Sequence, residues 1–292
     1  MKIPMQLSQG FPLFDERLPF LNQFTLDLAE NFNAGKIALW SDLDERVKYF
    51  FTTERMIEVE AAIPGWKKMA SYSGGVTLTH VICVFLGLLL LPEFQSLTYH
   101  QQQLAKWIVL FHDVEKVHIN GKRDHTHAFR SAITAAKALK DIGFATTNQY
   151  TDVFEAWQEL TLSAITDSTT QPAEIISDNS KLPEIIQGVE KMYGRNMPAS
   201  LIVKGVLLHM SINAVKDWPQ PAPLSGNEIV QYVDNELLPL LKVMHLADNE
   251  GWSMFEPETR AIQRSETLEA FEKVERLTHR QETVSSSNAG GL

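Results

Sequence analysis

Cysteine is nearly absent from the sequence: Cys83 is the only one among 292 residues. An intrachain disulfide is therefore excluded, and a chain of this length can bury a sizeable core without one. Cys83 lies in the apolar run Val81–Leu86, which predicts a small buried side chain rather than a reactive thiol. This cysteine usage is typical of proteins in a reducing compartment, and we expect a cytoplasmic location.

Positive charge is also scarce, since 26 Lys and Arg residues stand against 36 Asp and Glu residues, a formal net charge of −10. Binding to nucleic acid depends on neutralising phosphates with Lys and Arg, so a nucleic-acid partner is disfavoured. A small phosphorylated substrate held in a local basic pocket is compatible with an acidic chain. The composition leaves the oligomeric state open.

The sequence has no hydrophobic run long enough to span a bilayer. The strongest candidate, Val76–Leu91, is 16 residues long, short of the roughly 18–20 residues that are needed. It contains His80 and stops at Pro92, so we expect a buried core helix and no membrane partner. Residues 1–14 lack the continuous apolar stretch of a signal peptide.

Alternating strand patterns are scarce too, whereas apolar residues recur at helical spacing along most of the chain, which predicts an all-α fold. The expected helices span about residues 15–34, 41–62, 76–91, 98–118, 126–141, 150–166, 198–216, 227–251 (kinked at Pro239) and 258–280. Gly143 is expected to end the helix before it, a polar stretch covers 168–180, and 285–292 are expected to be disordered. We divide the chain into an N-terminal helical extension (1–73), a central helical domain (74–255) and a C-terminal amphipathic helix with its tail (256–292).

Two histidines are spaced so that a helical hairpin would bring them together. His80 lies about 11 residues, or ~16 Å of rise, before the end of its helix. His112 lies about 14 residues, or ~21 Å, after the start of the next one. In an antiparallel hairpin the two imidazoles reach about the same level, which is how helical bundles build metal sites. Asp113 can join them, and Lys116 shares the face of the pair.

A carboxylate late in the chain completes the candidate set. Asp248 follows Leu241 and Met244 at helical spacing, which places it on an apolar stripe. A buried carboxylate needs a cation or hydrogen bonds, so Asp248 is a candidate metal ligand. His245 is expected to orient it, and Trp252 is expected to lie in the core.

This pattern resembles the HD-domain superfamily of metal-dependent phosphohydrolases. The family signature is a His, a His-Asp pair and a distant Asp, which correspond here to His80, His112-Asp113 and Asp248. The segment 112–116 is similar to the family's His-Asp-x-x-Lys variant, and 127–132 to the His-containing helix that often follows. The resemblance covers residues 75–252 and implies an HD-type helical bundle.

The resemblance also implies a cofactor, namely one or two divalent ions from the group Mn, Fe, Co, Ni, Zn and Mg. Dinuclear members usually add two histidines between the dyad and the last Asp, and His127 and His209 are the candidates here. Asp167 is a third additional candidate ligand, because it falls where some members have a helix-end His.

The implied activity is hydrolysis of a phosphate ester of a nucleotide or a related small molecule. Asp113 would bridge two metals or orient water, and Lys116 would stabilise charge on the phosphoryl group, which makes both catalytic candidates. Arg130 is expected to contact phosphate.

Departures from the family keep alternatives open. Lys116 replaces the Glu of the His-Asp-x-x-Glu variant typical of some nucleotidases. A di-iron oxygenase branch has a similar His-Asp-x-x-Lys, and six rather than four ligating positions would favour it. A non-catalytic signalling or scaffold module is the second alternative. Purely structural roles are also available, for example hydrogen-bonded core histidines at positions 80 and 209.

Overall fold

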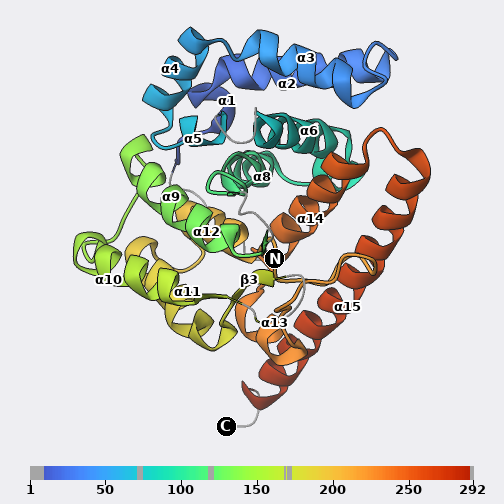
Figure 1. Cartoon of the computed structure of the whole chain (residues 1–292). Helices are drawn as coiled ribbons and strands as arrows, with labels where there is room; N and C mark the ends of the chain where they lie inside the picture. The colour runs from blue at the N-terminus through green and yellow to red at the C-terminus, as the bar shows by residue number, and fades with distance from the viewer. Residues whose placement is uncertain (1–9, 71–74, 118–121, 168, 170–172, 290–292) are drawn as a thin grey trace.

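The computed structural model describes residues 10–70, 75–117, 122–167, 169 and 173–289. Within these ranges the chain forms fifteen α-helices and one small three-stranded sheet, so the all-α prediction is confirmed apart from the sheet (Figure 1). No helix in the described part of the chain is both long and apolar enough to cross a membrane.

The N-terminal helices form a layer over the central helices (Figure 1). They are α1 (Phe14–Arg17), α2 (Pro19–Asn33), α3 (Trp40–Phe50), α4 (Thr53–Ala62) and α5 (Lys67–Ala70). In α2 the buried residues Leu21, Thr25 and Leu28 follow helical spacing and form one face. The single helix predicted over 41–62 is wrong, because Thr52 caps a new helix by accepting a hydrogen bond from the Arg55 amide.

The central helix is α6 (Val76–Leu90), which packs against α2, α3, α8 and α14. Its residues 77–88 are all buried, as expected of a helix that is apolar on every side. After the short α7 (Pro92–Gln95), the antiparallel partner α8 (Tyr99–Phe111) begins at a capping box formed by Thr98 and Gln101. The predicted helix over 98–118 is thus too long: α8 ends immediately before the His112-Asp113 pair.

Four helices form the opposite side of the molecule: α9 (His127–Ile142), α10 (Tyr150–Ser163), α11 (Leu182–Tyr193) and α12 (Pro198–Leu208). Gly143 adopts a φ of 104° and ends α9 as predicted, since a left-handed residue costs least as glycine. The sequence patterns missed α11, and they extended α12 eight residues beyond its end at Leu208.

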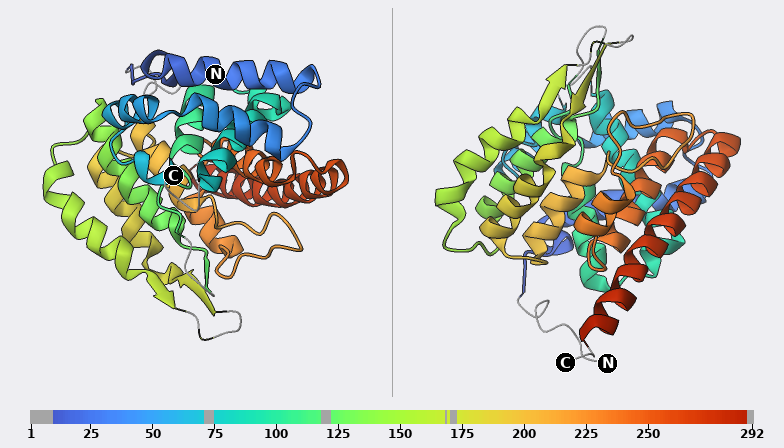
Figure 2. Two further views of the ribbon diagram at one scale, coloured as in Figure 1. Left: turned by 45° about the horizontal axis from the view of Figure 1, so that its top comes forward. Right: turned by 90° about the horizontal axis from the view of Figure 1, so that it is seen from below.

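A three-stranded sheet was not predicted. Its strands are β1 (Lys122–Asp124), β2 (Ile165–Asp167) and β3 (Ala173–Ser177), in the order β1-β3-β2. β3 pairs in parallel with β1 and antiparallel with β2, and the sheet projects from the end of the α9–α12 layer (Figure 2). Strands of three to five residues are too short to show periodicity, and β1 pairs with a strand that begins only at Ala173.

The C-terminal part consists of α13 (Gly226–Tyr232), α14 (Leu238–Ser253) and α15 (Pro257–Ala289). The kink predicted at Pro239 is instead a break, because the proline lies in the first turn of α14, where its missing N–H costs nothing. α15 packs along α13 and α14. It continues past the predicted end near residue 280, and the last three residues of the expected tail lie outside the described ranges.

Candidate metal centre

Six of the predicted ligands meet inside the protein. His80 comes from α6 and Asp248 from α14. His112 caps α8, and Asp113 lies in the turn that follows it. The other two are His127, the first residue of α9, and His209, which caps α12. The imidazoles and Asp113 are almost completely buried, whereas the Asp248 side chain keeps 20 % of its surface exposed.

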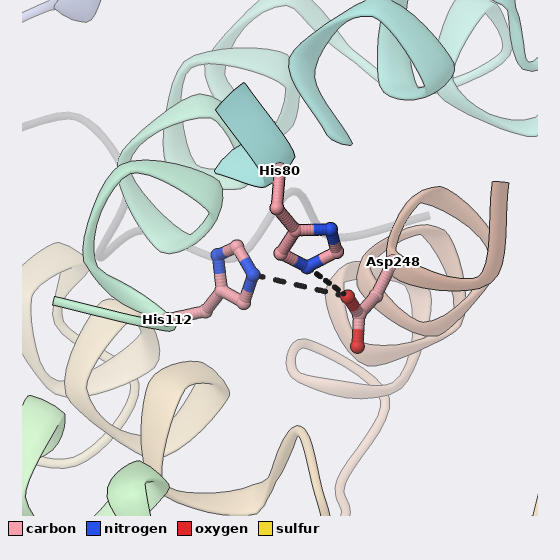
Figure 3. A group of neighbouring side chains, drawn as sticks. All are labelled: His80, His112 and Asp248. Carbon is pink, nitrogen blue, oxygen red and sulfur yellow. Dashed lines mark hydrogen bonds and ion pairs between the residues drawn. The ribbon is translucent and has the colours of Figure 1, made fainter. Parts of the chain in front are cut away.

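The first group of ligands is His80, His112 and Asp248, which point toward one another from three helices (Figure 3). Asp248 Oδ1 lies 3.0 Å from His80 Nε2 and 3.8 Å from His112 Nε2. The antiparallel packing of α6 and α8 brings the two histidines to one level, as the rise per residue predicted. Their ligand atoms lie within 4.8 Å of one another, so this group can hold a metal ion.

The second group is Asp113, His127 and His209, and it lies deeper. Asp113 Oδ1 is 2.8 Å from His127 Nε2 and 3.9 Å from His209 Nε2. Its other oxygen, Oδ2, faces the first group at 3.5 Å from His80 Nε2 and 3.7 Å from His112 Nε2. Asp113 therefore lies between the two groups.

The hydrogen bonds of three rings show which of their nitrogen atoms face the cluster as acceptors. Three Nδ1 atoms lie 2.7–3.0 Å from a backbone carbonyl oxygen: His112 from Val109, His127 from Asp124 and His209 from Val206. A carbonyl only accepts, so each Nδ1 carries the proton, and each Nε2 of a neutral ring presents a lone pair. The His127 and His209 Nε2 atoms are 3.2 Å apart and both face a carboxylate oxygen, so three acceptors converge.

One further ring atom agrees with this. His112 Nε2 is buried and has no hydrogen-bond partner within the described residues, whereas the unpartnered His80 Nδ1 belongs to the side of its ring away from Asp248 (Figure 3). A metal ion or an added proton would satisfy the converging acceptors. Backbone carbonyls that hold the far ring nitrogen are the usual support of a metal-ligating histidine. The donor set of imidazoles and carboxylates therefore fits a divalent ion.

The pKa directions favour the protonation states that metal binding requires. Burial lowers the pKa of His112, and burial together with the neighbouring imidazoles holds the pKa of His209 well below its ordinary value. Burial alone would raise the pKa of Asp113, but Lys116 and the neighbouring imidazoles outweigh it and lower that pKa strongly. The pKa of Asp248 is lowered against the effect of burial by its hydrogen bond from the facing imidazole. Neutral imidazoles and ionised carboxylates are the forms that coordinate metals.

Lys116 contacts the cluster, as its spacing predicted. Its Nζ lies 2.7 Å from Asp113 Oδ2, and about a quarter of its side chain is exposed. The residues around it form a turn rather than helix, because α9 holds this turn: Ser131 Oγ accepts from the Glu115 amide, and Arg130 donates to the Glu115 carbonyl. The Lys116 ammonium is therefore fixed next to the His112-Asp113 pair by tertiary contacts.

Asp124 is a supporting residue that the sequence patterns missed. Its carbonyl accepts from His127 Nδ1, and its carboxylate pairs with Arg130 and accepts from the Thr126 amide. Arg130, expected to contact phosphate, thus binds Asp124 and clamps the segment that orients His127. The sequence separation of Asp124 and Arg130 does not by itself predict that they pair, because the contact depends on the turn that leads into α9.

Three expected residues are placed differently. Asp167 lies on β2 with 65 % of its side chain exposed and pairs with Lys122 at 2.6 Å, so the structure does not bring it to the cluster. His245 contacts Phe271 and hydrogen-bonds the Leu208 backbone instead of orienting Asp248, and burial lowers its pKa to about 4. Trp252 was expected in the core, but 53 % of its surface is exposed.

No protein-family model, curated protein or solved structure matches this chain. Its own residues therefore provide the functional information: a helical protein with two buried His/Asp groups, each of which can hold a metal ion.

Proposed function

We propose that the protein is a metal-dependent phosphohydrolase of the HD type that uses two ions. The position of Asp113 carries the proposal, because one carboxylate oxygen faces each ligand group. A carboxylate placed in this way can bridge two ions. The order of the six residues along the chain, with two histidines between the dyad and the last Asp, is also that of dinuclear HD proteins.

The roles of the residues follow from their contacts. His80, His112 and Asp248 would hold one ion, His127 and His209 the other, and Asp113 both. A divalent ion bound there supplies Lewis acidity toward a phosphoryl oxygen and lowers the pKa of water toward neutrality. Lys116 is placed to bind a phosphoryl oxygen beside Asp113, and the buried histidines exclude bulk water from the inner side of the cluster.

A di-iron oxygenase is the second candidate, and the number of ligands favours it. The structure brings together six ligating residues rather than four, which is the number that the oxygenase branch of the superfamily requires. Both candidates share the bridging Asp113 and the adjacent Lys116. They differ in substrate, since one consumes a phosphate ester and water and the other consumes oxygen.

The test begins with metal content. Protein loaded with Mn, Fe, Co, Ni, Zn or Mg is analysed for ions per chain, then assayed against phosphate monoesters and diesters. Asp113→Asn should lose both ions and turnover, because it removes the charge that both groups share. Asp167→Asn is the matched control: its carboxylate is exposed and paired with Lys122, so metal content and turnover should be unchanged.

Lys116→Ala separates enzyme from scaffold. It should retain the metal and lose ~10²–10³ in kcat, the usual effect of removing one electrostatic stabiliser. Hydrolysis of no phosphate ester with any ion, together with oxygen consumption by the iron form in the presence of a polyol, would replace the hydrolase by the oxygenase. If neither activity occurs and Lys116→Ala changes only partner binding, catalysis is rejected.

A further inference from the structure

Trp252 lies at the rim of the cluster and is unusually exposed for its residue type. It follows Asp248 by one turn of α14, and 53 % of its surface is accessible, whereas tryptophan is highly buried on average. Its ring stacks on the imidazole of His80, with centroids 4.1 Å apart and planes 25° from parallel. One indole face therefore covers a candidate ligand, and a large apolar surface remains in solvent.

The cation that contacts this ring lies on the same side as His80. Lys116 Nζ is 5.2 Å from the indole centroid and 2.7 Å from Asp113 Oδ2. His80 Nε2 is 3.5 Å from that same oxygen. Asp113 Oδ2 therefore lies on the His80 side of the indole. A cation centred over the opposite face would have the indole and the imidazole between it and this oxygen, so it could not approach the oxygen to 2.7 Å as Lys116 does. Among the described residues, the outward face has no ring or cation contact.

We propose that this outward face of Trp252 determines specificity by stacking the planar ring of a substrate whose phosphate lies beside Lys116. The inference rests on the proposed phosphohydrolase function. An indole face accepts any planar base by stacking, and such contacts contribute about 1–3 kcal/mol per base. The base would lie on the outward face of the indole and the phosphate beside Lys116 on the His80 side, so the spacer between them passes the edge of one indole ring, as a sugar between base and phosphate can. The substrate class is therefore a phosphate ester bearing a flat ring, such as a nucleoside monophosphate, in preference to a plain sugar phosphate.

Calorimetry on the metal-loaded protein tests whether the outward face of Trp252 is a stacking platform for the substrate ring. Turnover is avoided by a temperature and time at which hydrolysis is negligible, or by a non-hydrolysable phosphonate. The probes are adenosine 5′-monophosphate and ribose 5-phosphate, or their phosphonate analogues. Trp252→Ala should weaken the nucleotide about 5- to 100-fold and leave ribose 5-phosphate within about twofold, whereas Trp252→Phe should retain most of the affinity. Trp218→Ala, which removes another exposed tryptophan at 69 % accessibility, should change neither.

Metal analysis of each variant distinguishes stacking on substrate from support of His80. Equal weakening of both probes with loss of metal would mean that Trp252 only holds His80, and the platform is refuted. Equal affinity of the wild-type protein for the two probes refutes it as well. Failure of the proposed function has a different signature, since nucleotide binding that depends on Trp252 would then persist with no phosphate ester hydrolysed by any metal form.

Discussion

The contact between α6 and α14 depends on a glycine next to the metal ligands. A Cβ at Gly251 would lie 2.5 Å from Val84 Cγ2, 3.2 Å from the Val84 amide nitrogen and 3.3 Å from His80 Cε1. Valine is restricted to one χ1 rotamer in a helix, so its methyl group cannot rotate away. Gly251→Ala therefore has to push the two helices apart or displace the His80 ring.

The change in unfolding free energy caused by Gly251→Ala is the sum of two opposing effects. Overpacking a core by one methyl group costs about 1–3 kcal/mol, and replacing glycine by alanine in a helix returns about 1 kcal/mol. The matched control is Gly226→Ala, where the nearest atoms to a new Cβ lie at 3.7 and 3.9 Å on Leu277. Relative to that control, Gly251→Ala should lower the unfolding free energy by about 1–3 kcal/mol and Tm by roughly 2–12 °C.

Thermal unfolding of the two variants, with and without metal, measures this difference. Metal affinity of Gly251→Ala should fall about 10- to 100-fold, because the contact that displaces His80 acts on a ligand's orientation. Val84→Ala in the same chain removes the 2.5 Å clash, so the cycle of four proteins should show a coupling of about 0.5–3 kcal/mol in favour of the double variant. If Gly251→Ala unfolds like Gly226→Ala and binds metal like the wild type, the close packing of α14 on His80 is refuted.

Three further outcomes are expected. Removing metal with a chelator should lower stability by about 2.7 kcal/mol relative to ion at 100 times its Kd, and a Tm unchanged by chelation would contradict the proposed metal binding by His127 and His209. Burial holds the pKa of His245 at about 4, below the ordinary 6.5, so its contribution to stability is complete above pH 6.5 and is lost as the pH falls to 4. Urea unfolding should show a decrease of up to about 3 kcal/mol over that window, and His245→Gln should flatten the curve. Asp124→Ala should weaken metal binding about 10- to 100-fold in a chelator competition, because it removes the partner of Arg130 behind His127; an affinity equal to that of the wild type would show that the clamp is dispensable.

Local spacing was sufficient to predict the helical hairpin and much of the centre. The meeting of His80 and His112 follows from the constant rise of a helix, and this is why residue counting along two helices found it. The stop at Gly143 is equally local, since it depends on the backbone freedom of one residue. The stripe that carries Asp248 could be read because a buried helix face repeats at a fixed interval.

Tertiary contacts decided where α8 ends and where Asp167 lies. α8 ends at Phe111 because Ser131 and Arg130 bind the following turn, and no pattern within 98–118 shows this. Asp167 was assigned to a helix end, yet its place on β2 follows from pairing with β3, which depends on hydrogen bonds to a separate strand.

The sequence by itself thus determined which residue types were available for a metal centre and which helices carry them, because helix rise and amphipathic spacing act over a few turns. Only the tertiary structure decided that Asp113 faces both ligand groups, that Asp124 orients His127, and that Trp252 stands at the rim. Each of these depends on how a side chain meets atoms from another element, and the packing of distant segments sets that geometry.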